Sequence, residues 1–227
     1  MKSGLIKDII EWDIDNWKKC LNYWPKNSDI NLDNALVLEL GSRNGGLSLW
    51  AAMNGANVIC SDKDGPTDDA KRKHKKYSVS QLIQYKEVDV LKIPYENELD
   101  VIMSKSILGA LGYDDNITNQ KIAISEIYRA LRKEGEFWFI ENLIASPLHQ
   151  LMRKKFVKWG DNWRYVSINE MMLFLNQFSS VKYKTFGVTS CFGRNEKQRK
   201  ILSKFDDVVA KITPNDWKYI IVGVATK

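Results

Sequence analysis

The sequence has few of the features that mark secreted, zinc-binding or membrane-spanning proteins. Its 227 residues include only three cysteines, Cys20, Cys60 and Cys191, and this odd number at wide spacings predicts neither a disulfide framework nor a zinc site. No apolar run approaches the roughly 18 residues of a membrane-spanning helix. Acidic residues interrupt the N-terminal segment, which therefore lacks the pattern of a signal peptide. We expect a cytoplasmic protein of one domain.

Negative charge is the scarcer sign. The chain has 34 lysines and arginines against 28 acidic residues, a formal net charge of +6. Such an excess suits nucleic acid, an anionic membrane surface or an acidic substrate, and equally a lysine-rich surface that keeps the protein in solution. No DNA- or RNA-binding motif accompanies the charge, so we favour the last interpretation.

A glycine-rich turn is present between a short apolar run and a helical pattern. Residues 35–40 read Ala-Leu-Val-Leu-Glu-Leu and residues 41–46 read Gly-Ser-Arg-Asn-Gly-Gly, followed by an apolar helical segment that ends at Gly55. A strand, a tight turn and a helix in this order open a nucleotide-binding α/β domain. Gly41, Gly45 and Gly46 would allow positive φ angles and a close approach of a ligand to the backbone. Backbone N–H groups at the start of the helix would then face that ligand.

Glu39 indicates which ligand this turn binds. Its carboxylate would repel the pyrophosphate of a dinucleotide, but it suits a ligand that carries a cation, such as the α-ammonium of S-adenosylmethionine. The run Glu39-x-Gly41-x-Arg43-x-Gly45 resembles motif I of the class I S-adenosylmethionine-dependent methyltransferases, an acidic residue followed by G-x-G-x-G. Arg43 replaces the middle glycine of that motif.

Polar residues follow the next strands in the order of the family's motifs. Asp62 stands after a strand over residues 57–61, where a carboxylate can accept both hydroxyls of an adenosine ribose. Asp89 follows a strand over residues 81–88, and the resemblance implies that it accepts a hydrogen bond from the adenine amine. The resemblance covers residues 35–145. It implies S-adenosylmethionine as the cofactor and a cofactor site made of Glu39, Gly41, Arg43, Gly45, Asp62, Lys63, Asp89, Val90 and Ser104.

The elements alternate as in a doubly wound α/β fold. We expect strands over residues 35–40, 57–61, 81–88, 99–103, 136–140, 181–187 and 218–226, with helices between them. The resemblance implies a seven-stranded, mostly parallel sheet in the order 3-2-1-4-5-7-6. Its last strand would run antiparallel, and helices would cover both faces.

Two segments flank this core. Residues 3–25 are expected to form two short amphipathic helices that end at Pro25, and they either pack against the sheet edge or cover the site as a lid. A predominantly helical insertion is expected over residues 146–178. We therefore divide the single domain into a helical lid (1–34), a cofactor-binding core (35–145) and a substrate-side part (146–227).

Few residues are available for proton transfer. The two histidines are His74, in a basic run that we expect on a solvated helix face or, as the alternative, in an anion-binding patch, and His149, which follows strand five. The carboxyl end of strand five lies at the edge of the sheet where the cofactor is expected. His149 and Glu141 stand at or after this end and are therefore the candidate catalytic residues. Many members of the resembling family have a histidine after strand four, where this chain has none.

Glu141 and Asn142 also resemble half of the divalent-metal site of catechol-type methyltransferases. The other half would need an acidic residue at the end of strand four, where this chain has Ser104 and Lys105. We therefore predict no metal.

Aromatic and basic residues gather after strand five. The candidate substrate-binding residues are Trp159, Trp163, Arg164, Tyr165 and Arg194. Flat rings can hold a sugar while arginines bind a phosphate or carboxylate. The segment from Glu141 to Arg194 loosely resembles methyltransferases encoded with bacterial surface-polysaccharide enzymes, which implies a small-molecule acceptor, a hydroxyl of a saccharide. The alternatives are RNA methylation, for which the same rings and charges could serve, and a non-catalytic relative that keeps only the fold.

Overall fold

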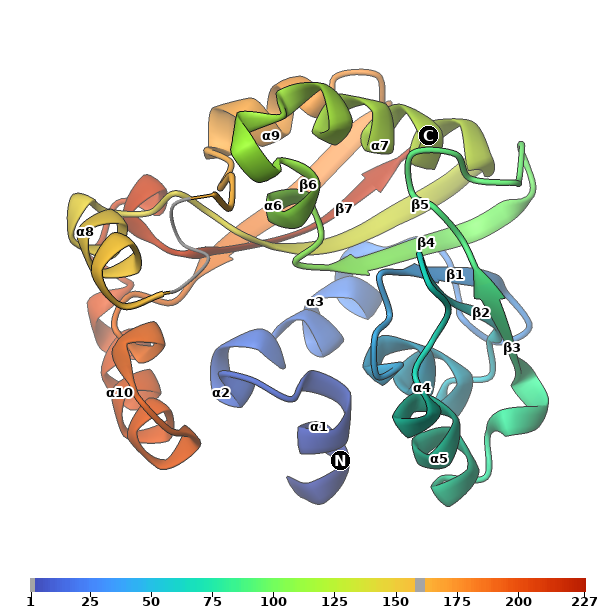
Figure 1. Cartoon of the computed structure of the whole chain (residues 1–227), viewed down its shortest axis with the longest axis horizontal. Coiled ribbons are helices and arrows are strands. Elements are labelled where there is room, and N and C mark those ends of the chain that lie inside the picture. Colours follow the sequence, from blue (N-terminus) through green and yellow to red (C-terminus); the bar gives the residue numbers. More distant parts are fainter. Residues whose placement is uncertain (1–2, 158–161) are drawn as a thin grey trace.

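The computed structural model describes residues 3–157 and 162–227, which contain one seven-stranded sheet with helices on both faces (Figure 1). The strand order is β3-β2-β1-β4-β5-β7-β6, and β7 runs antiparallel to both of its neighbours. The predicted order and the antiparallel last strand are confirmed. The strands are β1 (Leu36–Leu40), β2 (Asn57–Asp62), β3 (Ile83–Glu87), β4 (Leu99–Lys105), β5 (Leu131–Asn142), β6 (Ser180–Phe186) and β7 (Ile220–Thr226).

The helices form two layers and a cluster at one end of the sheet (Figure 1). One layer contains α1 (Ser3–Ile10), α2 (Ile14–Trp17), α3 (Cys20–Asn27), α4 (Gly46–Met53) and α5 (Asp68–Lys76). The opposite layer contains α6 (Leu108–Leu111), α7 (Ile117–Ala130) and α9 (Ile168–Phe174). At the end lie α8 (Pro147–Phe156) and α10 (Glu196–Val209). In residues 3–157 and 162–227, none of the helices has the length and apolar content needed to cross a bilayer.

Short 3-10 helices complete the backbone: η1 (Ser80–Leu82), η2 (Tyr113–Asp115), η3 (Ser190–Phe192) and η4 (Asn215–Trp217). The expected elements differ from the structure in the N-terminal segment and at the start of strand five. The N-terminal segment forms three helices rather than two, and Pro25 lies inside α3 instead of ending it. Strand β5 begins at Leu131, directly after α7, because its first residue pairs with Leu99 before an irregularity in the register of β4 and β5.

The N-terminal helices pack beneath the middle of the sheet through tryptophans. Trp24 of α3, Trp50 of α4 and Trp138 of β5 form a mutual cluster with ring centroids 5.8 to 6.1 Å apart. The Trp24 indole N–H donates to the Gly223 carbonyl of β7 at 3.1 Å. These buried rings fix α3 against the strands and so determine where the preceding helices, α1 and α2, are placed.

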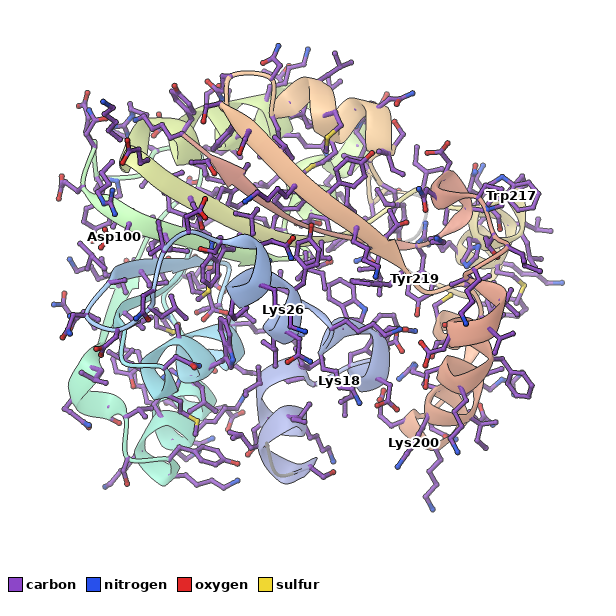
Figure 2. All side chains as sticks on the ribbon, turned by 180° about the vertical axis from the view of Figure 1, so that it is seen from behind. Lys18, Lys26, Asp100, Lys200, Trp217 and Tyr219 are labelled. Atoms are coloured by element: carbon purple, nitrogen blue, oxygen red, sulfur yellow. The ribbon has the colours of Figure 1, made fainter. Side chains whose placement is uncertain are left out.

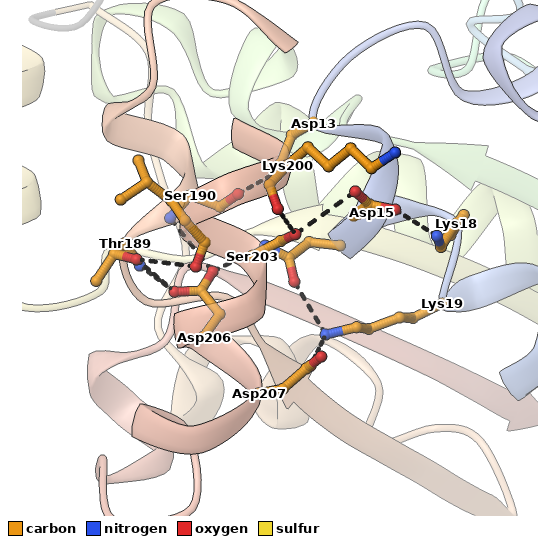
Figure 3. A network of polar contacts seen from close by, with 12 residues as sticks. Asp13, Asp15, Lys18, Lys19, Thr189, Ser190, Lys200, Ser203, Asp206 and Asp207 are labelled. Carbon is orange, nitrogen blue, oxygen red and sulfur yellow. Dashed lines mark hydrogen bonds and ion pairs between the residues drawn. The ribbon is translucent and has the colours of Figure 1, made fainter. Parts of the chain in front are cut away.

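Buried polar contacts join α2 to the C-terminal part of the chain (Figures 2 and 3). Asp13 accepts hydrogen bonds from the Ser190 hydroxyl at 3.0 Å and from the Tyr219 hydroxyl. Asn16 donates through its side chain to Asp206 of α10 and to the Tyr219 oxygen, both at 2.9 Å. All five side chains are buried, so this network holds the N-terminal helices to α10 and to the start of β7.

Candidate active site

A large cleft opens at the carboxyl ends of β1, β2 and β4, the edge at which open α/β sheets bind ligands. Its volume is about 1860 Å³. One end is bordered by the glycine-rich turn and by residues 88–91, and the other end by α8 and residues 191–194. Helices α1 and α2 form part of its wall. The cleft is thus long enough to hold two ligands side by side.

The glycine-rich turn has the conformation that its glycines allow. Gly41 and Gly45 have φ angles of 62° and 65°, and Arg43, which replaces the motif's middle glycine, also has a positive φ of 47°. The Asp62 carboxylate fixes this turn by accepting hydrogen bonds from the backbone N–H groups of Arg43 and Lys63, both at 2.8 Å. Gly41, Arg43, Asp62 and Lys63 all line the cleft.

Glu39 lies behind the turn rather than in the cleft wall. Its carboxylate accepts hydrogen bonds from the backbone N–H of Ser48 at 2.7 Å, from the Ser48 hydroxyl and from the N–H of Leu47 at 3.3 Å. Burial raises the pKa of Glu39 to about 7, against the lowering effect of these hydrogen bonds. Its position corrects the expectation of direct contact with an ammonium group: Glu39 caps the first turn of α4 and so holds the glycine-rich turn in place.

His74 supports the same turn from the other side. It is fully buried, with Nε2 2.8 Å from the Gly45 carbonyl oxygen and Nδ1 3.0 Å from the Tyr85 hydroxyl. The expectation that the whole basic run lies on a solvated face is therefore wrong at this position. A Cβ on Gly45 would lie 2.6 Å from the imidazole, which explains why glycine is needed there beyond its φ angle.

The remaining predicted cofactor residues divide into two groups. Asp89 and Val90 line the cleft next to the glycine-rich turn, and Asp89 orders its own loop by accepting the N–H of Leu91 at 2.9 Å. Ser104 is fully buried and is not part of the wall, which corrects its assignment. Ser106, two residues later, lines the cleft in its place.

Near α1 and α2 the cleft wall contains two residues that the glycine-rich motif did not indicate, Lys105 and Trp17. Lys105, at the end of β4, lines the cleft and donates to the carbonyl of Ile10 in α1 at 2.9 Å. Burial lowers the pKa of Lys105, while Glu11 and Glu39 raise it. The Trp17 side chain is 3% exposed and lines the cleft, and its indole N–H has no hydrogen-bond partner in the described part of the chain. A buried donor of this kind is satisfied when a ligand brings an acceptor oxygen.

The two candidate catalytic residues are engaged within the chain. His149 lines the cleft, with Nε2 donating to the Val188 carbonyl at 2.8 Å, so that Nδ1 accepts from the Ser146 hydroxyl at 2.7 Å. Burial lowers the pKa of His149 to about 4. Glu141 lies outside the wall and accepts the N–H groups of Ile107 at 2.7 Å and Leu108 at 3.1 Å. Glu141 thereby orders the loop after β4, which corrects its catalytic assignment.

The candidate substrate-binding residues lie in different places. Trp163, Tyr165 and Arg194 line the cleft. Arg164 does not, because its guanidinium is paired with Asp115 at 2.8 Å and with Glu170. Trp159 lies outside the described residues.

Gly109 of α6, after β4, lies directly against Trp163. A Cβ on Gly109 would lie 1.5 Å from Nε1 of Trp163, so the short helix α6 leaves room there for the indole.

Arg153 of α8 belongs to the aromatic and basic segment after strand five but was not among the five candidate substrate-binding residues. Its guanidinium lies 3.8 Å from the centre of the Tyr165 ring and donates to the carbonyls of Leu143 at 2.8 Å and Ile144 at 2.9 Å. It lines the cleft, and burial lowers its pKa. Within residues 3–157 and 162–227 it forms no ion pair. The position of Arg153 in the cleft wall depends on its contact with Tyr165, which the sequence alone does not show.

A metal site would need several ligands close together. Over the part of the chain that the structure describes, no group of three or more His, Cys, Asp or Glu side chains is placed to hold an ion.

Comparisons with known proteins agree with this geometry. Residues 38–139 match the family described as "Methyltransferase domain". No curated protein sequence matches the chain. Solved structures with a similar fold number 1080 chains, so the fold itself does not select an acceptor.

Three of these structures illustrate the similarity in fold, sequence identity and coverage. A Haemonchus contortus phosphoethanolamine N-methyltransferase 2 in complex with S-adenosyl-L-methionine has a TM-score of 0.65 at 16% identity, over 98% of this chain and 56% of that one. A complex of the Haloferax volcanii Trm112 methyltransferase activator and a putative methyltransferase gives 0.64 at 14% identity, over 99% and 94%. A putative methyltransferase from Bacillus halodurans gives 0.59 at 15% identity, over 92% and 97%. Residues 38–139 thus match a methyltransferase domain, and the described chain has the Rossmann-like methyltransferase fold.

Proposed function

We propose that this methyltransferase domain transfers a methyl group from S-adenosylmethionine to a hydroxyl of an anionic small molecule, a saccharide that bears a phosphate or carboxylate. The observation that carries the proposal is Arg153, a cation in the cleft wall with no carboxylate partner among the described residues. The proposal extends to surface-polysaccharide precursors as the source of such a saccharide.

The cofactor would occupy the end of the cleft that contains the glycine-rich turn. Asp62 still has lone pairs for the ribose hydroxyls beside the two N–H groups that it accepts. Asp89 and Val90 would border the adenine. Lys105, beside α1, is placed to bind the carboxylate of the methionine moiety. The sulfonium would then face the end of the cleft that contains Arg153.

The acceptor end combines one fixed cation with flat aromatic surfaces. Arg153 is held by Tyr165 and by two carbonyls, so its position is set before a ligand arrives, and a half-buried cation gains most from an anionic ligand. Trp163 and Phe192 also line this part of the cleft and offer ring faces for a sugar. An anionic glycoside matches both features.

The protein contributes to this reaction mainly by positioning the methyl donor and the acceptor. The acceptor oxygen attacks the methyl carbon, the carbon–sulfur bond breaks, S-adenosylhomocysteine leaves as a neutral thioether and the hydroxyl proton is released. Both ring nitrogens of His149 are already hydrogen-bonded, so we assign it the role of positioning α8 and hence Arg153. In this proposal the proton leaves to water in the open cleft.

Two alternatives share the anionic feature. A structural neighbour is a Haemonchus contortus phosphoethanolamine N-methyltransferase 2 in complex with phosphomonomethylethanolamine, so a phosphorylated amine is a second candidate acceptor. RNA, the third, would bring many phosphates to the lysines and arginines of the cleft and would bind with steep salt dependence, whereas a sugar phosphate brings one or two charges.

The test is a transfer assay with labelled S-adenosylmethionine and four acceptor panels: neutral sugars, sugar phosphates and uronic acids, phosphorylated amines, and RNA. We expect label in the sugar phosphates or uronic acids. Arg153→Gln should raise the KM for that acceptor at least tenfold and leave the Kd for S-adenosylhomocysteine within twofold. Arg72→Gln on exposed α5 is the matched control and should change neither value.

Other outcomes would overturn the proposal. Label in neutral sugars with equal efficiency, or an unchanged KM in Arg153→Gln, would remove the anionic group from the acceptor. Label only in RNA or only in the amines would select the corresponding alternative. If the cofactor binds and no panel is labelled, the saccharide class is rejected.

A further inference from the structure

Helix α10 presents its apolar residues to solvent. Ile201, Phe205, Val208 and Ile212, spaced four, three and four residues apart, form one stripe along the helix and its C-terminal extension. Their exposed fractions are 59%, 59%, 67% and 85%. A stripe of this length on one helix face is unusual for a surface that contacts only water.

The orientation of α10 is fixed by the polar contacts on its inner side. Asp206 is fully buried and accepts hydrogen bonds from the Thr189 N–H at 2.6 Å, the Thr189 hydroxyl at 2.7 Å and the Ser190 N–H at 3.2 Å. Asn16 adds the bond described above. Turning the apolar stripe inward would break these bonds and leave a buried carboxylate without partners, so the stripe faces outward in the folded protein.

Positive charge runs beside the stripe. Lys197, Lys200, Lys204 and Lys211 are exposed, and none of them forms an ion pair within the described residues. At 100° per residue these lysines lie along one flank of the apolar stripe. The exposed acid of this helix, Asp207, is paired with Lys19 at 3.0 Å. The uncompensated charge of this surface is therefore positive.

Helix α8 lies at the same end of the sheet (Figure 1) and has the same character. Leu148 and Leu151 are 56% and 62% exposed, and Lys154 and Lys155 are exposed beside them. Trp217, 52% exposed, lies at this end together with Lys200 when the protein is seen from behind (Figure 2). Aliphatic and aromatic side chains interleaved with exposed lysines are thus gathered at one end of the molecule.

We propose that this end, the outer faces of α10 and α8, docks on the surface of an anionic lipid bilayer. Apolar side chains of this kind enter the boundary between head groups and acyl chains, while lysines pair with anionic head groups. A second copy of the chain fits less well, because it would bring like-charged lysine rows together. The partner must therefore offer an apolar region for the stripe and anionic groups for the lysines.

The proposal is tested by co-sedimentation of the full chain with vesicles of phosphatidylcholine alone or with 40% phosphatidylglycerol. We expect binding to the anionic vesicles, at least tenfold tighter than to the neutral ones and weaker at 0.5 M than at 0.1 M salt. Phe205→Ser with Ile212→Ser should weaken binding at least tenfold, and Lys200→Glu with Lys204→Glu likewise. Leu173→Ser is the matched control, since Leu173 is 68% exposed on α9, outside the two helices that form the proposed surface.

The variants alter exposed side chains, so their melting temperatures should match that of the wild type and exclude unfolding as the cause. Absent binding, or equal binding to both vesicle types, would overturn the proposal. So would a dimer in sedimentation velocity that Phe205→Ser dissociates, because a second copy would then occupy the stripe. An equal loss of binding in Leu173→Ser would show that the contact is not confined to this end.

Discussion

Side chains outside the glycine-rich turn determine its shape. Asp62 holds the backbone of Arg43 at a positive φ, Glu39 caps α4 behind the turn, and His74 contacts Gly45 from α5. A non-glycine residue in this conformation costs roughly 1–2 kcal/mol, so the turn persists because its neighbours hold it. Cofactor affinity should therefore depend on residues that need not touch the cofactor.

Replacement of Glu39 tests this dependence. Glu39→Ala removes the acceptor for two backbone N–H groups and the Ser48 hydroxyl, bonds that each contribute roughly 1.5–3 kcal/mol when the acceptor is charged. We expect the turn to lose order and S-adenosylhomocysteine binding to weaken by part of that energy. Titration calorimetry measures the effect. Glu87→Ala, an exposed acid at the end of β3, is the control and should leave affinity unchanged. An unaltered Kd in Glu39→Ala would mean that the turn is stable without its cap.

At this scale the sequence predicted what is local and missed what is not. Gly41, Asp62 and Asp89 were predicted because each stands at a strand end, a position that the chain alone reveals. The partners of Glu39 lie 8 and 9 residues away, those of His74 11 and 29, and those of Arg153 10 and 9. These contacts also depend on which face of a helix turns inward. Motif spacing does not carry that information.

Contacts between helices decide how the first elements cover the cleft. A Cβ on Gly46, the first residue of α4, would lie 2.0 Å from the carbonyl oxygen of Ile9 in α1. Gly46 is thus a point of close approach and not, as expected, a residue with positive φ. The sequence predicted amphipathic helices here, but not the contact between α1 and α4. A glycine at the start of a helix can serve several purposes, so Gly46 did not indicate that contact.

Gly46→Ala should displace α1 from α4. We expect faster hydrogen exchange in residues 3–10 and a loss of roughly 1–3 kcal/mol in the free energy of unfolding, as for an overpacked contact. Mass spectrometry of exchanged peptides and urea denaturation measure the two effects. Gly4→Ala is the matched control: a Cβ there meets nothing within 4 Å, so it should stabilise α1 by roughly 0.5–1 kcal/mol. Equal exchange in the two variants would contradict the assigned contact.

Over the whole molecule, the order of the sheet was expected from the resemblance to the methyltransferase family, and the structure confirms it. The network that joins Asp13 to Ser190 and Tyr219 was out of reach, since it unites residues from opposite ends of the chain. Burial, opposed by its hydrogen bonds, raises the pKa of Asp13 to about 7, and the carboxylates of Asp206 and Glu196 add to the shift. This pKa links the stability of the whole fold to pH.

The sign of that linkage is definite. Between pH 3.8 and about 7 the unfolded chain has released the Asp13 proton and the folded chain retains it, so this group lowers the free energy of unfolding as pH rises through that window. Asp13→Asn should reduce the fall between pH 5 and pH 8 by roughly 1–3 kcal/mol, as measured by urea denaturation at several pH values. Asp207→Asn, an exposed acid of α10, serves as the control. Parallel pH profiles for wild type and Asp13→Asn would refute the shift.

The bond from Trp24 to Gly223 has a consequence for synthesis on the ribosome. It joins residues 199 positions apart, and the bond from Asn16 to Tyr219 spans 203. The N-terminal helices therefore leave the exit tunnel long before the strand on which they rest. At about 5–20 residues per second this interval lasts roughly 10–40 s, during which the Trp24 indole lacks its hydrogen-bond partner in β7. Nascent chains of this protein should therefore engage chaperones through their first 27 residues until β7 has been released.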